Sequence, residues 1–472
     1  MAQISRLSVS PAPTAPPREA TGHLFLRGYV ILVLFVTFAH TAVFNLVGPI
    51  GSTITLGVLT ASTLAIWIPA LARQRPQRYP WRRLPWAALA YVAFALLSVA
   101  WSQWPAATLL TGALLLSITV NALFIAASLS WHEIIRALGS AFKWILGLSL
   151  LLELWVSLVL RAPLLPNFFD APSEKINPHW YWVRNNLLDG GRIQGIVGNS
   201  NVLAILCIIA LVVFGVLMAA GARRRGTLIA WMLLAAFLFV RAGSATAAAC
   251  AVAVTVVLIT VLLMRRARVP EQRTRIYIAY AAVAVALLAT VWFGRDVLFS
   301  ALGRSSDLTG RLDIWQTVLT RAAQHPVIGN GFSSPWVPWD PGFAGWIDDH
   351  GITVFHAHNM WVDVYFQLGA VGVILMIATY LSLVWRSWFF AVDRPRWDLN
   401  AHRRYSALAV LPTLLVALLL TQGLAESGPI MLWGWMLVVL FSAKIKAVPL
   451  VGVGLSERAN LVEGGPRRKQ AP

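Results

Sequence analysis

Long apolar runs separated by short polar segments are the dominant pattern along this chain. A helix that crosses a bilayer needs about 20 apolar residues. Runs close to that length occur at 28–48, 52–72, 86–101, 106–128, 139–160, 200–220, 226–242, 243–264, 276–293, 359–384, 406–422 and 428–443. The seventh and eighth are separated only by a turn around Arg241. We therefore predict an all-α polytopic membrane protein with about 12 transmembrane helices.

The composition agrees with lipid as the solvent of this chain. Hydrophobic residues make up 58%, charged residues 12%, and the mean hydropathy is +0.69, whereas soluble proteins carry about 25% charged residues. The net charge of +19 could suggest nucleic acid, but the basic residues lie in short loops between apolar runs. We expect the lipid bilayer as a partner and no nucleic acid. Because Cys207 and Cys250 lie within apolar runs, neither disulfides nor a thiolate metal site is expected.

The basic loops predict the topology. With the N-terminus inside, the clusters at 73–83, 223–225, 265–275 and 386–404 and the basic C-terminal tail all fall on one side, as the positive-inside rule requires. We predict a cytoplasmic membrane protein with both termini cytoplasmic. Its parts are a disordered cytoplasmic tail (1–22), a single transmembrane domain (23–447) and a cytoplasmic C-terminal tail (448–472). Two long loops, about 161–199 and 294–357, would then lie outside.

The second outer loop contains the pattern of a short interfacial helix. Apolar residues recur at helical spacing (Leu312, Trp315, Leu319, Ala322), and polar residues face away from them (Asp313, Gln316, Thr320, Arg321). Asp307 or Thr309 could cap the helix, and Pro326 stops it. Arg311 lies in its first turn, where an arginine reaching to lipid headgroups is the simpler interpretation.

Polar residues from distant parts of the chain gather at the outer ends of the predicted spans. His358 and Asn359 begin the tenth span, with Asp363 one turn later, and His356 is expected to point elsewhere. The others are Arg192, Asn199, Asn201, Arg241 and Glu426. Each has a plain structural interpretation as a cap or polar contact, and the loop tryptophans suit a membrane interface. Their convergence nevertheless predicts a cationic, glycine-lined cavity, suited to a pyrophosphate attached to a lipid.

A metal site and a transporter are two alternative interpretations of the same residues. Asp348-Asp349-His350 and His356-Ala-His358 offer metal ligands, but no His-Glu-x-x-His spacing supports them. A lipid-linked glycan flippase or another polysaccharide transporter would be expected to show repeat symmetry and midplane ionisable sites. This sequence shows neither clearly, and a structural scaffold would leave the clustered outer Arg and His residues unexplained.

Three groups of residues resemble a known family. They are Thr309-Gly-Arg311-Leu-Asp-Ile-Trp315 with His325-Pro-Val-Ile-Gly329-Asn-Gly331, His358-Asn359 with Gly369-Ala-Val-Gly372, and Gly191-Arg192…Gly195…Gly198-Asn199…Asn201. Together they resemble the O-antigen ligase and polymerase superfamily, whose signature region would be about 303–372, and Gly303-Arg-Ser…Thr-Gly-Arg looks most like its exopolysaccharide polymerase branch. The family commonly has a Ser-Arg pair where this chain has Arg241-Ala-Gly-Ser244, which puts the role of Arg241 in doubt.

The resemblance implies an inverting, metal-independent glycosyltransferase without a cofactor. Its donor would be a polyprenyl-diphosphate glycan and its acceptor a glycan or glycolipid, in either a ligase or a polymerase. The candidate catalytic residues are His358 as general base and Arg311 and Arg192 as phosphate-binding cations. The candidate substrate-binding residues are Asn199, Asn201, Arg241, Trp315, Asn359, Asp363 and Glu426.

The topology predicts a labelling pattern. A cysteine placed at Ser334 should react with a membrane-impermeant thiol reagent in intact cells, because its loop lies outside. A cysteine at Gln272 should remain unlabelled. The opposite pattern would overturn both the topology and the convergence of the site residues.

Overall fold

A computed structural model describes residues 21–73, 81–169, 176–267, 269–301, 311–349, 351–393 and 405–448. Outside them lie most of the two predicted tails, part of the signature region with Asp307 and Thr309, and His350. Within the described residues the chain forms thirteen α-helices and one small antiparallel sheet.

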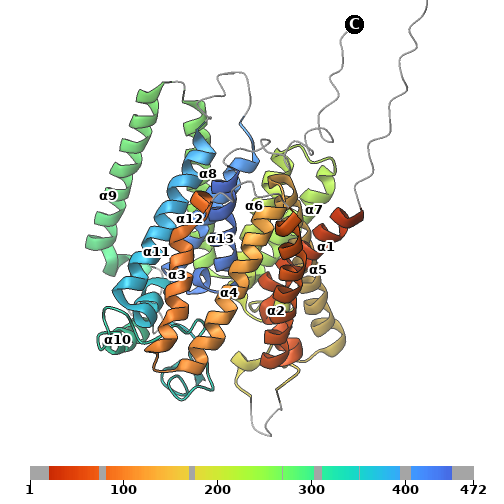
Figure 1. Cartoon of the computed structure of the whole chain (residues 1–472), viewed down its shortest axis with the longest axis vertical. Helices are drawn as coiled ribbons and strands as arrows, with labels where there is room; N and C mark the ends of the chain where they lie inside the picture. Colours follow the sequence, from red (N-terminus) through yellow and green to blue (C-terminus); the bar gives the residue numbers. More distant parts are fainter. Residues whose placement is uncertain are drawn as a thin grey trace, which may run out of the picture.

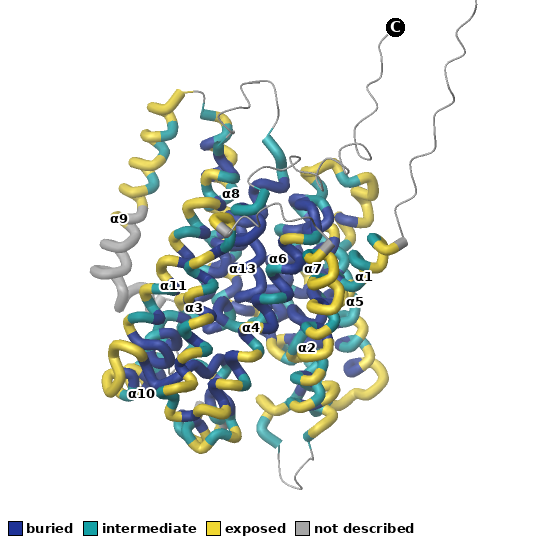
Figure 2. The backbone as a smooth tube through the Cα atoms, in the orientation of Figure 1, coloured by how far each residue is buried: buried dark blue, intermediate teal, exposed yellow. Residues whose placement is uncertain are grey.

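The helices, in order, are α1 (Thr21–Phe38), α2 (His40–Arg73), α3 (Trp86–Leu97), α4 (Pro105–Ser128), α5 (Trp131–Trp155), α6 (Ser200–Ala219), α7 (Arg225–Ala242), α8 (Ala245–Arg266), α9 (Pro270–Ala301), α10 (Arg311–Ala322), α11 (Met360–Val392), α12 (Leu411–Gly423) and α13 (Leu432–Ala447). The sheet joins β1 (Asp348–Asp349) to β2 (Ile352–Thr353). Helices α4 and α13, α6 and α7, α8 and α12, and α3 and α11 pack as pairs. The buried centre lies on α13, α4 and α6 (Figure 2).

The helices agree with a multi-pass membrane protein. In the described part, seven are long and apolar enough to cross a bilayer: His40–Ala72, Pro105–Ser128, Trp131–Leu160, Ser200–Ala219, Arg225–Ala242, Ala245–Arg266 and Met360–Val392. Shorter apolar helices cover Gly22–Phe38, Trp86–Ala100 and Leu408–Gly423. The total of about 12 spans stays a prediction.

The first predicted span has the wrong boundary. The run 28–48 is divided between α1 and the start of α2, which bends at Gly48 (φ 75°, ψ 179°). Pro49 follows Gly48, and a proline lacks the backbone N–H that a continuous helix would use. Hydrophobicity identified this region as helical but could not place the end of α1 at Phe38 or the bend of α2 at Gly48.

Both long polar segments lie at the same end of the bundle, with α10 (Figure 1). The first is held by Glu153 of α5, whose Oε1 accepts hydrogen bonds of 2.8 Å from the backbone N–H groups of Gln194 and Gly195. Ser149, one turn earlier, accepts from the N–H of Ile196 at 3.2 Å. A carboxylate inside an apolar run needs such partners, so Glu153 has a structural explanation.

The second segment is joined to a broken transmembrane helix. α11 leaves the helical conformation at Gly369 (φ 60°, ψ −161°). The N–H groups of Ala370 and Val371 would serve the carbonyls of Phe366 and Gln367 in a continuous helix. They donate instead to the carbonyls of Pro326 and Val327, at 2.8 and 3.1 Å. The N–H groups of Asn330 and Gly331 donate in turn to the freed carbonyls of Phe366 and Gln367, at 3.1 and 2.9 Å. This exchange satisfies all four carbonyls and fixes the loop on α11.

Helix α10 has a buried face, an exposed apolar face and an exposed polar face, rather than the single apolar and single polar faces expected. Ile314, Val318 and Ala322 are buried. Leu312 and Leu319, predicted to share one apolar stripe with Ala322, are 41% and 42% exposed. Their side chains therefore form a separate apolar face, as suits a helix at a membrane interface.

Ser334 is a poor labelling position because it is buried. Ala344 lies in the same loop, which is predicted to be outside, and is exposed, so it replaces Ser334 in the topology test. Cys207 and Cys250 are both buried and should not contribute background labelling.

Gly329 tests the backbone exchange. An added Cβ at Gly329 would lie 2.3 Å from the carbonyl oxygen of Gln367, so Gly329→Ala should abolish the joint between loop and helix. Gly345 has a similar φ (+64° against +71°) but nothing within 4 Å of its Cβ position. Gly345→Ala should therefore show only the left-handed strain, about 1–2 kcal/mol. The yield of monodisperse protein and its melting temperature compare the two, and equal values would contradict the proposed joint.

Candidate active site

The Glu426 carboxylate connects three separate parts of the chain. It lies in the turn between α12 and α13, and its side chain is 11% exposed. Oε1 accepts a hydrogen bond from Arg311 Nη2 at 3.0 Å and one from Asn201 Nδ2 at 3.4 Å. Oε2 lies 3.1 Å from His358 Nδ1. The starts of α6, α10 and α11 therefore meet at one buried anion.

The charge of Glu426 is set by its neighbours. Burial raises the pKa of its carboxyl, but the hydrogen bond from His358 and the nearby His356, His358 and Arg311 together bring this pKa below its usual value. Glu426 is therefore ionised near neutral pH and can only accept hydrogen bonds. It follows that His358 Nδ1 carries a proton, so in the neutral tautomer compatible with this contact Nε2 has the free lone pair.

His356 packs against His358 instead of pointing elsewhere, so that prediction is wrong. The two ring centroids are 4.2 Å apart, and His356 Nδ1 accepts from the backbone N–H of His358 at 3.1 Å. The reason is that His358 has a left-handed backbone (φ 52°), a conformation uncommon for a residue other than glycine. Burial, helped by the neighbouring His358 and Arg311, lowers the pKa of His356 to about 3, so this ring stays neutral.

Asp363 lies behind the site, fully buried in the first turn of α11. Its Oδ2 accepts from the backbone N–H of Ala357 at 3.1 Å and from the hydroxyl of Ser427. Ala357 precedes His358, and Ser427 follows Glu426. One carboxylate therefore fixes the two turns that present the His358–Glu426 pair. Trp315 supports the same turn, because its Nε1–H donates to the carbonyl of Ala357 at 2.8 Å.

Two of the predicted residues cap helices. Asn199 accepts from the N–H groups of residues 201 and 202, at 2.9 and 3.2 Å, at the start of α6. Asn359 does the same for Trp361 and Val362 at the start of α11, at 2.9 and 3.3 Å, and its Nδ2 donates to the carbonyl of Leu424 at 3.1 Å. Asn359 thereby also links α11 to the turn that carries Glu426.

Arg192 joins the network through Asn201, whose Oδ1 accepts from Nη2 at 2.6 Å. Arg192 Nε donates to the carbonyl of Ala242 at 2.8 Å, and burial lowers the pKa of its guanidinium. Arg241 does not join the network. It holds the loop that precedes Arg192 in the chain, because its Nη2 donates to the carbonyls of Asn186 and Leu187 at 2.8 Å.

Sequence reasoning missed Arg184. This half-buried guanidinium has a pKa lowered by burial and by the charge of Arg192. Its Nε is buried without a hydrogen-bond partner among the described residues. Arg184 follows an aromatic stretch and belongs to none of the quoted motifs, so only its position beside Arg192 singles it out.

The structure therefore divides the predicted residues into two groups. Arg192, Asn201, Arg311, His358 and Glu426 form one continuous hydrogen-bonded network. Asn199, Arg241, Trp315, Asn359 and Asp363 surround it in positioning contacts. Such a network combines fixed cations with an imidazole oriented by a carboxylate, so it can bind an anion and accept a proton.

The same cluster contains the residue types of a metal site. Ligand atoms of His356, His358 and Glu426 all lie within 4.8 Å of one another. However, His356 Nδ1 already accepts a backbone N–H, and Glu426 is already bound to Arg311. A divalent cation beside that guanidinium would be repelled. The arrangement fits a proton acceptor better than a metal centre.

A comparison with known families covers the part of the site that carries Arg311 and His358. A family profile described as "O-Antigen ligase" matches residues 230–377, which include α10 and the start of α11. A curated relative, "Exopolysaccharide production protein ExoQ" of Rhizobium meliloti (strain 1021), is 29% identical over 117 residues. That alignment covers 23% of this chain and 26% of the relative, so the chain matches about a quarter of the relative's length. Over residues 230–377 the chain is thus similar to the O-antigen ligase family, and the predicted resemblance to the O-antigen ligase and polymerase superfamily is confirmed.

Proposed function

We propose that this protein is a membrane glycosyltransferase that transfers or polymerises glycans from a polyprenyl-diphosphate carrier at the outer face of the cytoplasmic membrane. The observation that carries the proposal is the His358–Glu426 pair in one hydrogen-bonded network with Arg311 and Arg192. The acceptor is a glycan or a glycolipid.

His358 acts as the general base in this reaction. Its Nε2 takes the proton of an acceptor hydroxyl while that oxygen attacks the anomeric carbon of the donor. The bond from this carbon to the diphosphate oxygen breaks, and the leaving diphosphate keeps the electron pair. Attack opposite the leaving group inverts the configuration. Glu426 stabilises the imidazolium that forms and keeps the ring in the required tautomer.

The arginines stabilise the leaving diphosphate, where negative charge develops. Arg311 uses only Nη2 toward Glu426, and its Nε and Nη1 make no hydrogen bond with any described residue. Arg192 and Arg184 lie together on the other side of Asn201. Arginine matches phosphate oxygens with two parallel N–H groups, which suits this task.

Two observations support the class and the orientation. A transferase needs an oriented His–Glu pair to take the proton of its acceptor, whereas the repeat symmetry expected of a transporter is not clear in this sequence. The junction between the end of α8 and the start of α9, which carries the predicted cytoplasmic cluster 265–275, lies at the end of the bundle opposite α10 (Figure 1). By the positive-inside rule, this arrangement supports a site that faces outward and cytoplasmic termini.

The role of His358 is tested with purified protein, a polyprenyl-diphosphate glycan and an acceptor. His358→Ala should lower the rate of transfer by about 10²–10⁴-fold, because a positioned base contributes that much. EDTA should leave the wild-type rate unchanged. His325→Ala is the matched control: His325 is exposed in the turn after α10 and lies outside the network. Loss of transfer with EDTA would make His356, His358 and Glu426 metal ligands, and a wild-type rate from His358→Ala would remove the base.

The arginines are tested by substitutions that keep the charge. Arg311→Lys and Arg192→Lys should each lower turnover at least tenfold, since lysine loses the paired N–H geometry. Arg161→Lys provides the control, because Arg161 is exposed at the same end of the molecule and donates only to a nearby carbonyl. Full activity of both lysine variants, at normal protein levels, would contradict their role in phosphate binding.

A further inference from the structure

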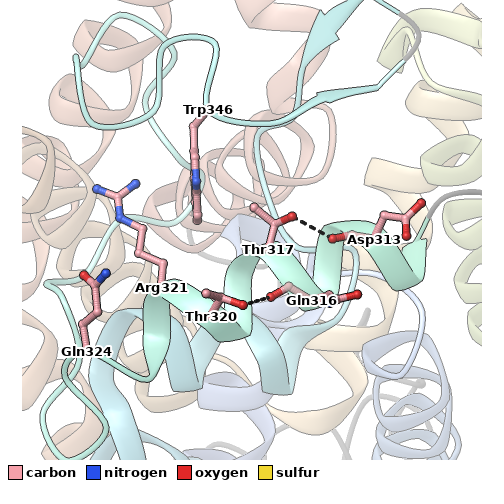
Figure 3. A pocket seen from close by; sticks show the side chains of 7 residues that line it. All are labelled: Asp313, Gln316, Thr317, Thr320, Arg321, Gln324 and Trp346. Carbon is pink, nitrogen blue, oxygen red and sulfur yellow. Dashed lines mark hydrogen bonds between the residues drawn. The ribbon is translucent and has the colours of Figure 1, made fainter.

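The face of α10 turned away from Arg311 borders an open groove of about 660 Å³. Asp313, Gln316, Thr317 and Thr320 line it along the helix and Gln324 lines it from the turn that follows, while Trp346 borders it from the loop before the small sheet (Figure 3). None of these residues takes part in the network around Glu426. We propose that this groove binds uncharged saccharide units of the glycan, remote from the reacting bond.

The polar groups of the groove are of mixed kind. Thr317 and Thr320 donate their hydroxyl protons to the carbonyls of Asp313 and Gln316, at 2.9 and 2.8 Å, so their oxygens present lone pairs to the groove. The Asp313 carboxylate and the side-chain amides of Gln316 and Gln324 make no hydrogen bond within the described part of the chain. Acceptors from Asp313 and the two threonines thus lie together with the glutamine amides, which can also donate, and this suits a ligand whose hydroxyl groups both donate and accept.

The charges of the groove argue against a phosphate ligand. Its one cation, Arg321, is already engaged: Nη1 donates to the carbonyl of Gly342 at 2.8 Å, and Nη2 to Gln103 Oε1 at 3.3 Å. Its guanidinium also lies 4.6 Å from the centre of the Trp346 ring. Asp313 is therefore the charged group that remains free to meet a ligand. Its negative charge would repel an anion. An uncharged polyhydroxyl chain fits the remaining amides, hydroxyls and indole edge.

The groove is joined rigidly to the candidate active site. Arg311 is the first residue of α10, and Trp315 on the same helix binds the carbonyl next to His358. From Asp313 to its last residue, Ala322, the helix rises about 14 Å, and Gln324 extends the groove into the turn that follows, so the groove is long enough for more than one sugar ring. Contacts with remote sugars would supply binding energy to hold the reacting end in place. The inference rests on the proposed glycosyl transfer and assigns a place to the rest of the glycan.

The experiment uses full-length protein and substrates of two lengths. Its probes are donors and acceptors with one repeat or with several repeats, prepared from the surface polysaccharide of the cells that make the protein. Gln316→Ala combined with Gln324→Ala should raise KM for the several-repeat substrates about tenfold, since two hydrogen bonds are lost. The rate with one-repeat substrates and the melting temperature should not change. Gln272→Ala, an exposed glutamine on α9, is the matched control.

The outcomes separate this inference from the proposed function. If wild-type protein transfers glycan and His358→Ala does not, but the double variant matches Gln272→Ala at both lengths, the groove does not bind glycan. An equal loss at both lengths would also overturn it, since the variant would then disturb the active site itself. If wild-type protein transfers no glycan, the proposed function fails. Binding of the free several-repeat oligosaccharide to His358→Ala protein, weakened about tenfold by the double substitution, would support the groove independently of turnover.

Discussion

The Glu426 carboxylate is shared by Arg311, His358 and Asn201, and the rest of the site depends on this sharing. A carboxylate that is nine-tenths buried is costly unless each oxygen has a partner. The three partners belong to the starts of different helices, so satisfying one anion fixes those helix ends relative to one another. The dependence is mutual, because without Glu426 the largely buried Arg311 would lose its ion-pair partner among the described residues. The structure thus uses one buried negative charge to join Arg311 and His358 directly and Arg192 through Asn201.

Two further carboxylates, Glu153 and Asp363, support this arrangement, and both act on backbone N–H groups. Glu153 holds the loop that leads to Asn199 and Asn201, and Asp363 joins the turns of His358 and Glu426. The exchanged hydrogen bonds at Gly369 add a third constraint. In an apolar environment a loop must find partners for its polar backbone within the protein. The chain meets that demand with acidic side chains and a broken helix, and as a result its polar loops become rigid supports for the site.

Much of this could be predicted from the sequence because position along a membrane helix is a one-dimensional property. Alternating basic loops placed Arg192, Arg311, His358 and Glu426 at one end of the bundle, and local patterns identified Asn199 and Asn359 as caps. The failures involve contacts that no local pattern encodes. Asp363 acts through Ser427, 64 residues later, and Arg184 matters only because it lies beside Arg192. His356 meets His358 because of a left-handed backbone at His358, and the break between α1 and α2 lies inside one continuous apolar run.

The position of the polar network at one end of the bundle has an electrostatic reason. Charged groups at the centre of a bilayer cost about 2.5–3.5 kcal/mol each on insertion scales, and this network contains two arginines and a carboxylate. At the interface those groups keep partial contact with water, which is consistent with side-chain exposures of 22% for Arg311 and 27% for His358. The proposed donor has the same division, since its polyprenyl chain requires lipid and its glycan requires water. A diphosphate at the junction between the two would lie at the level of these arginines. The amphipathic α10, with one apolar exposed face, one buried face and one polar face, is the element best suited to hold that junction.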